Sequence, residues 1–187
     1  MEVIFIEALS QNRRYTYEDY LSWPEDERWE IIDGVAHMLA APNVAHQSIS
    51  FELCGQIRDY LKGKSCRAFA APFSVRLDDD TVVEPDISVI CDMSKLDNGK
   101  ACVGAPDMIV EIMSPSASSR EKVVKFNKYL QAGVREYWVV YPDSKSVSVY
   151  LLKDGWYVAS EYADTDTVPV VVLAGCTIRL PDVFSGL

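Results

Sequence analysis

Two carboxylates lie in segments whose other residues are typical of buried β-strands. Asp86 falls within the run Thr81–Ile90, and Glu111 falls within the run Pro106–Met113. A lone carboxylate among apolar side chains either becomes protonated or costs several kcal/mol, unless a cation or hydrogen-bond donors meet it. If the two strands are neighbours, one shared cation can satisfy both acids.

A divalent cation held by two acids is a common basis for hydrolysing phosphodiesters. The alternative is that each acid forms a structural ion pair with Lys or Arg. Lys122, Lys125 and Lys128 follow Glu111 on the next expected helix, and spacings of three keep them near one face. Lys125 has an apolar neighbour on each side, so it is the lysine that we expect to point toward the acids.

Glu30 and His46 are two further candidates, each with two interpretations. Glu30 lies on an expected hairpin strand, either as an exposed acid or as an extra metal ligand. His46 lies in the first turn of an expected helix, either as a hydrogen-bonded structural histidine or at the rim of an active cleft.

The composition is that of an ordinary globular domain. The chain has 187 residues, 49% of them hydrophobic and 25% charged, which predicts a single domain over residues 1–187. No apolar run approaches a membrane span. The five cysteines show no C-x-x-C spacing and only two histidines accompany them, so we expect packing cysteines, no zinc site and a cytoplasmic protein.

The formal net charge of −10 argues against a nucleic-acid partner. Proteins that bind nucleic acid usually carry a basic face, and an acidic chain repels phosphate at long range. Binding to DNA therefore requires a local basic strip together with bound divalent cations.

Capping and turn residues divide the chain into helices and strands. The expected elements are a short helix opening at Thr16, a hairpin over 28–40, a helix opening at Asn43 and ending at Gly63, strands over 67–77, 82–90 and 107–113, a helix opened by a Ser118–Glu121 capping box and ending at Gly133, and strands over 135–142, 146–152, 156–162 and 170–180. This order predicts an α/β (α+β) fold with a mixed sheet and an additional antiparallel C-terminal meander.

Taken in order, these segments resemble the PD-(D/E)XK nuclease superfamily, and within it the Uma-two family of restriction-endonuclease-like proteins. The resemblance covers nearly the whole chain and is carried by Tyr15–Tyr20, Glu30–Gly34, His46–Gln47, Val83–Asp86, Gly104–Asp107, Val110–Ser116, Lys125 with Tyr129, and Gly133–Trp138. It implies a restriction-endonuclease-like mixed sheet flanked by helices. It also implies Mg²⁺ (or Mn²⁺) held by Asp86 and Glu111, with the Ile112 carbonyl as a further ligand.

The chain departs from the superfamily pattern at one position. The superfamily lysine would stand two residues after Glu111, where this chain has Met113. The Uma-two family supplies the lysine from the next helix, at the position of Lys125. The resemblance thus implies a metal-dependent endonuclease acting on DNA. Its catalytic residues would be Asp86, Glu111, Lys125, Glu30 and His46.

Two other functions remain open. The acidic charge and Met113 favour a catalytically inactive module that keeps the nuclease fold for binding or assembly. A metal-dependent hydrolase of small phosphate compounds would need no steering toward a long polyanion. We also expect a homodimer, because the aromatic-rich meander over Val147–Tyr162 would present exposed strand edges.

Overall fold

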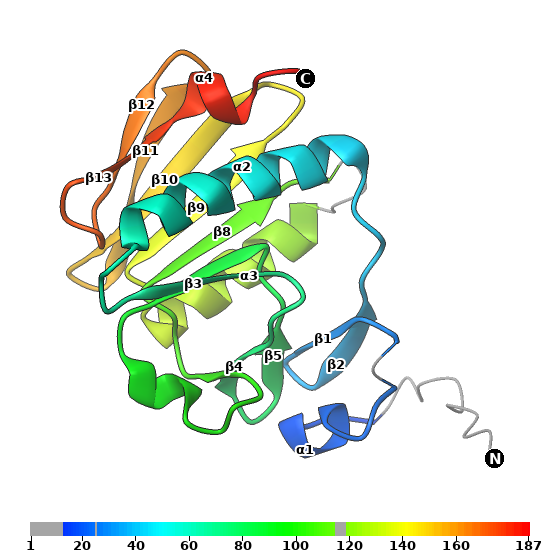
Figure 1. Cartoon of the computed structure of the whole chain (residues 1–187). Coiled ribbons are helices and arrows are strands. Elements are labelled where there is room, and N and C mark those ends of the chain that lie inside the picture. The colour runs from blue at the N-terminus through cyan, green and yellow to red at the C-terminus, as the bar shows by residue number, and fades with distance from the viewer. Residues whose placement is uncertain (1–12, 25, 115–118) are drawn as a thin grey trace.

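Figure 1 shows the computed structural model, which describes residues 13–24, 26–114 and 119–187. A six-stranded sheet with the order β11-β10-β9-β8-β6-β3 forms its centre. Strands β8 and β9 run parallel, and the other neighbouring pairs of this sheet run antiparallel. The strands are β3 (Arg67–Ala70), β6 (Ile87–Ile90), β8 (Met108–Ile112), β9 (Glu136–Tyr141), β10 (Ser146–Lys153) and β11 (Trp156–Ala163). The predicted mixed α/β (α+β) fold, with an antiparallel meander formed by β9, β10 and β11, is confirmed.

A five-stranded sheet with the order β2-β1-β5-β4-β7 lies beside the first, and a two-stranded sheet pairs β12 with β13. Their strands are β1 (Trp29–Ile32), β2 (Val35–Met38), β4 (Val75–Asp78), β5 (Thr81–Val83), β7 (Cys102–Val103), β12 (Thr167–Val170) and β13 (Cys176–Arg179). The predicted hairpin of β1 and β2 turns at Asp33 and Gly34, whose φ angles of 50° and 71° suit a two-residue turn.

The two long helices cover opposite faces of the six-stranded sheet (Figure 1). On one face, α2 (Val44–Leu61) packs Ile49, Leu53, Ile57 and Leu61 into a core that includes Val110 and Trp138. On the other face, α3 (Ser119–Ala132) buries Tyr129 with Ile109 and Tyr137. Side chains alternate along a strand, so Glu111 shares the face of Ile109 and points toward α3.

The remaining elements are short: α1 (Tyr17–Tyr20), the 3₁₀ helix η1 (Met93–Leu96) and α4 (Leu180–Val183). Thr16 and Asp19 form the predicted capping box of α1. Within the residues described, no helix is both long and apolar enough to cross a membrane.

The strands expected on either side of the Asp78–Asp80 turn are wrong as continuous strands. Each divides in two, because the chain passes from the six-stranded sheet (β3, β6) to the five-stranded sheet (β4, β5) and back. The divisions fall at Pro72 and Pro85, and proline has no N–H for a strand ladder. Asp86 follows Pro85 directly, so its carboxylate lies where the two sheets meet.

Three other expectations have different outcomes. The strand expected over 170–180 is wrong, since that stretch contains the end of β12, a turn, and β13 running into α4. The loop expected over 95–106 contains part of η1 and the short strand β7. The Ser118–Glu121 capping box lies outside the residues whose side chains the structure describes.

The expectation that all five cysteines are packing residues is wrong for two of them. Cys66 and Cys91 form a disulfide. They flank β3 and β6, and the register of that antiparallel pair places them opposite each other. Sequence spacing could not show this, because the two residues are 25 positions apart. Cys54, Cys102 and Cys176 are free.

The N-terminal cap of α2 can be tested by substitution. The Asn43 side chain accepts a 2.9 Å hydrogen bond from the backbone N–H of His46, as predicted for a cap. We expect Asn43→Ala to lower the free energy of unfolding, measured from urea titrations, by about 1 kcal/mol. Asn43→Ser should retain most of the stabilisation that the cap contributes. Equal unfolding midpoints for the alanine variant and the parent would contradict this role.

Candidate active site

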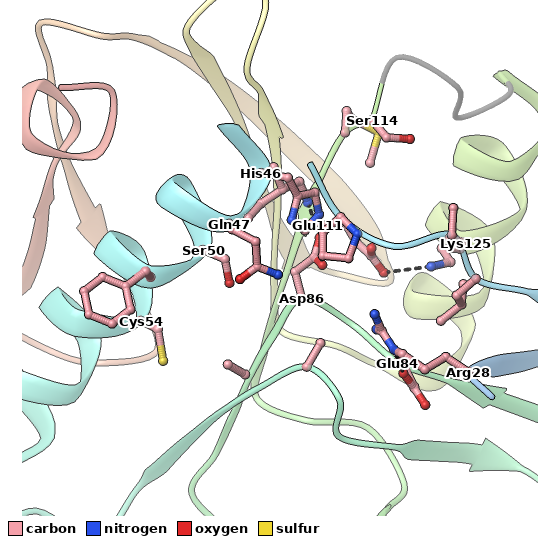
Figure 2. A pocket seen from close by; sticks show the side chains of 18 of the residues that line it. Arg28, His46, Gln47, Ser50, Cys54, Glu84, Asp86, Glu111, Ser114 and Lys125 are labelled. Carbon is pink, nitrogen blue, oxygen red and sulfur yellow. Dashed lines mark hydrogen bonds and ion pairs between the residues drawn. The ribbon is translucent and has the colours of Figure 1, made fainter. Parts of the chain in front are cut away.

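A cleft of about 420 Å³ opens between α2, α3, the end of β8 and the connection from β5 to β6. Figure 2 shows that Asp86, Glu111 and His46 converge in it while Lys125 approaches from α3. These four residues line the cleft, as expected of site residues. Glu30, the fifth candidate, lies behind Lys125 and is not among the lining residues.

Glu111 lies in β8, and Asp86 stands immediately before β6, the antiparallel neighbour of β8. β6 and β8 pair with Ile87 opposite Val110, which brings the residues flanking that pair together. The Asp86 Oδ2 atom accepts a 2.7 Å hydrogen bond from the backbone N–H of Ile112, the residue after Glu111. The two acids therefore lie side by side as expected, although Asp86 precedes its strand rather than lying on it.

Lys125 is buried against two carboxylates. Its Nζ atom lies 3.2 Å from Oε1 of Glu111 and 2.8 Å from Oε1 of Glu30. Sequence reasoning predicted the amine within about 5 Å of one of the acids, and this proximity is confirmed. Burial lowers the pKa of the Lys125 amine, but the charges of Glu111 and Glu30 outweigh burial and raise this pKa above its usual value. The amine therefore remains charged.

The other two lysines of α3 point elsewhere. Lys128 forms an ion pair with Asp33 in the β1–β2 turn. The Lys122 ammonium lies 5.7 Å from the centre of the Tyr141 ring. Of the three predicted lysines, Lys125 alone contacts Glu111 within the residues described.

Tyr129 is a site residue whose role sequence reasoning missed. Its hydroxyl donates a 2.5 Å hydrogen bond to Oε1 of Glu111, the oxygen that also faces Lys125. Burial raises the pKa of Glu111, and the charges of Asp86 and Glu30 add to this, whereas Lys125 and Tyr129 oppose it. The signal was present in the sequence, because Tyr129 stands four residues after Lys125 and so shares its helix face.

Glu30 is not an exposed strand acid, so that interpretation is wrong, whereas its role as an extra metal ligand stays a prediction. It is 1% exposed, because β1 lies inside its sheet between β2 and β5. Its Oε1 atom accepts hydrogen bonds from Lys125 and, at 2.9 Å, from the backbone N–H of Glu84. Glu30 thus anchors the lysine.

His46 lies at the cleft and contacts Asp86. Its Nε2 atom is 3.1 Å from Oδ1 of Asp86, and that hydrogen bond raises the pKa of the imidazole despite burial. The interpretation that places His46 at an active cleft agrees with this position. Ser50 and Cys54 also line the cleft, at successive spacings of four along α2. This spacing would have predicted their shared face.

A second buried acid at the cleft was not predicted. Glu84 accepts from Arg28 Nε at 2.9 Å and from the Tyr20 hydroxyl at 3.1 Å. Figure 2 shows the Arg28–Glu84 pair beside the acid cluster.

The donor set suits Mg²⁺ better than zinc. Within the described part of the chain, no group of three or more His, Cys, Asp and Glu side chains is placed to hold a metal. Mg²⁺ usually keeps several waters and binds through one or two carboxylates, whereas structural zinc sites take four protein ligands. Asp86 and Glu111, with Ile112 also at the cleft, fit the first pattern.

Comparison with known proteins identifies relatives that cover most of the chain. A curated relative from Synechocystis sp., "Uncharacterized protein slr1290", is 24% identical over 175 residues, which cover 91% of each chain. A crystal structure from Anabaena variabilis, described as "a putative nuclease belonging to DUF820", is 27% identical. It covers 91% of this chain and 97% of its own, with a TM-score of 0.76.

The family model of Uma2, described as "Putative restriction endonuclease", matches residues 17–181. This span contains every candidate site residue named above, and it confirms the resemblance seen in the sequence. The chain therefore belongs to the Uma2 family.

Proposed function

We propose that the protein is a metal-dependent endonuclease that hydrolyses phosphodiester bonds of DNA. The observation that carries this proposal is the convergence of Asp86, Glu111 and Lys125 in one cleft. Two acids and one lysine are the functional groups that the resemblance to restriction endonucleases requires. Membership of the Uma2 family and the likeness to a nuclease-described structure support a nuclease.

Asp86 and Glu111, with the Ile112 carbonyl, would hold Mg²⁺, or Mn²⁺ in its place. When bound, such an ion lowers the pKa of a water molecule and offsets charge on the phosphate. Lys125 would orient the attacking water or stabilise the negative charge that develops in the transition state.

The neighbouring residues keep these groups in place. Glu30 holds the Lys125 amine from the side away from the cleft. Tyr129 fixes Glu111 through its hydroxyl. His46 fixes Asp86 through its Nε2 atom. Because these contacts are buried or partly buried, the acids and the lysine are positioned before substrate arrives.

One observation favours a second function, the catalytically inactive binding or assembly module. The net charge of −10 opposes an approaching polyanion. A hydrolase of small phosphate compounds would avoid the same repulsion. Both alternatives predict no Asp86-dependent cleavage of DNA.

Metal binding can be tested by thermal unfolding. A cation that binds only the folded protein stabilises it by about 2.7 kcal/mol at 100 times its Kd. We expect Mg²⁺ or Mn²⁺ to raise Tm by several degrees and Asp86→Asn to abolish this rise. Asp154→Asn, in the exposed β10–β11 turn, is the control and should keep it. An unchanged rise in Asp86→Asn would exclude the shared metal site.

Lys125 can be tested by cleavage kinetics. We expect Lys125→Ala to lower the cleavage rate about 100-fold or more, as loss of one transition-state donor does, while metal-induced stabilisation persists. The substitution leaves buried carboxylates unpaired, so folding must be checked by circular dichroism. The control is Lys128→Ala, one turn along α3, with an expected rate within about twofold of the parent. Full activity in folded Lys125→Ala would refute the catalytic role.

The dimer is also a proposal, and the edge strand β11 supports it. β11 ends the six-stranded sheet (Figure 1), with Trp156 73% and Val158 49% exposed. Among the described residues β11 pairs only with β10, and an open edge of eight residues invites pairing with a second copy. Light scattering at micromolar concentration should give twice the mass of one chain, and Val158→Lys should reduce it to the monomer value. A monomeric parent would contradict this proposal.

A further inference from the structure

A second cavity, of about 450 Å³, lies beside the cleft between α3 and strands β8, β9 and β10. The residues that matter for its chemistry are Met113, Lys122, Val123, Phe126, Tyr141 and Tyr150. Its walls are mostly aromatic and apolar, with a lysine at one side. The reaction described above requires none of these side chains.

The floor of this cavity is a fixed aromatic cluster. The Phe126 ring packs edge-on against Tyr150 at 5.1 Å and against Tyr157 at 5.2 Å between ring centres. Tyr137 stacks on Tyr150 at 5.8 Å and is itself buried. Because these rings hold one another, they form a rigid apolar surface rather than a flexible patch.

Tyr141 differs from the rings of the floor. It is half-buried at the end of β9 and belongs to none of the ring pairs found among the described residues. The Lys122 ammonium lies 5.7 Å from its ring centre. Val123, which is 60% exposed, contributes another wall. The cavity thus combines an aromatic ring that the Lys122 ammonium covers on one side, an apolar wall and a cation.

The cavity borders the active-site cleft. Met113, Lys122 and Tyr137 line both. Lys122 therefore stands between the acid cluster and the aromatic surface. A nucleotide chain with one phosphate beside Asp86 and Glu111 would have its neighbouring base within reach of the cavity, and Lys122 beside the backbone between them.

Charge favours an occupant that binds by stacking. At a net charge of −10 the chain cannot rely on long-range attraction to phosphate. Stacking of a base on an aromatic side chain contributes about 1–3 kcal/mol. A base inside a duplex is already stacked and paired, so its π-face is available only when it is unpaired or flipped out.

We propose that this cavity is a nucleobase subsite that receives an unpaired base next to the phosphate held at the acid cluster. The proposal rests on the nuclease function above and narrows its substrate to single-stranded or locally unpaired nucleic acid. Tyr141 supplies the stacking face, and Lys122 contacts the adjoining phosphate. Affinity then comes from stacking more than from counterion release.

The test is equilibrium binding of a labelled ten-nucleotide single-stranded DNA, followed by fluorescence anisotropy with Mg²⁺ present. Lys125→Ala, checked for folding, serves as the background for every variant, because it slows cleavage and is expected to keep the metal site. A second probe carries the same backbone with abasic sites in place of its bases. We expect Tyr141→Ala to weaken binding of the normal probe about 5- to 150-fold, the equivalent of one lost stack. Binding of the abasic probe should change less than twofold.

Two further variants distinguish stacking from general damage. Tyr141→Phe keeps the ring and should bind the normal probe as the background does. Val171→Ala removes an exposed apolar side chain in the turn after β12, which lines neither cavity, and should have no effect. The ratio of normal to abasic affinity should persist between 50 and 200 mM salt, because stacking is not screened.

Three results would overturn the subsite: equal affinity for the two probes, equal weakening of both by Tyr141→Ala, or no weakening at all. Cleavage by the parent protein is measured in parallel. Cleavage without base-dependent binding would remove the subsite and leave the nuclease function standing. Base-dependent binding without cleavage would leave the subsite standing and remove the nuclease function.

Discussion

The ion pair of Lys125 with Glu111 and Glu30 is the interaction on which the rest of the site depends. Each of the three groups comes from a different layer: Glu30 from the five-stranded sheet, Glu111 from the six-stranded sheet and Lys125 from α3. All three are less than 10% exposed, so none can turn to water for solvation. Removing one partner of such a buried set leaves an uncompensated charge and costs about 3–5 kcal/mol. The same contacts that join the layers therefore fix the geometry of the cleft.

This arrangement explains why the lysine can come from a helix. Alternation along β8 turns Glu111 toward α3, and α3 runs across that face of the sheet. A lysine at position 113 would be on the same face as Glu111, but there the chain has Met113, which borders the aromatic cavity. Moving the amine to α3 frees this position for an apolar side chain. The proposed catalytic groups and the proposed base subsite thus share Met113 as a boundary.

Sequence reasoning predicted the fold class, the two acids and Lys125. A charged residue within an otherwise apolar segment is easily recognised in a sequence. It failed where the decisive contact is between segments far apart in the sequence. Nothing near Glu30 shows that β1 lies inside a sheet, and nothing near Cys66 shows that Cys91 is opposite. The divided strands were missed because both expected strands were continued through Pro72 and Pro85, where the chain crosses between the two sheets. Helix spacing alone would have placed Tyr129 on the face of Lys125 and Ser50 on the face of His46.

The account depends most directly on whether the acid cluster cleaves DNA. The decisive measurement is incubation of the purified protein with supercoiled DNA and with single-stranded DNA, with Mg²⁺ or Mn²⁺ and with a chelator, beside Asp86→Ala. The account predicts metal-dependent cleavage by the parent protein and none by Asp86→Ala. Absence of cleavage by a folded, metal-binding parent, or equal cleavage by Asp86→Ala, would contradict it.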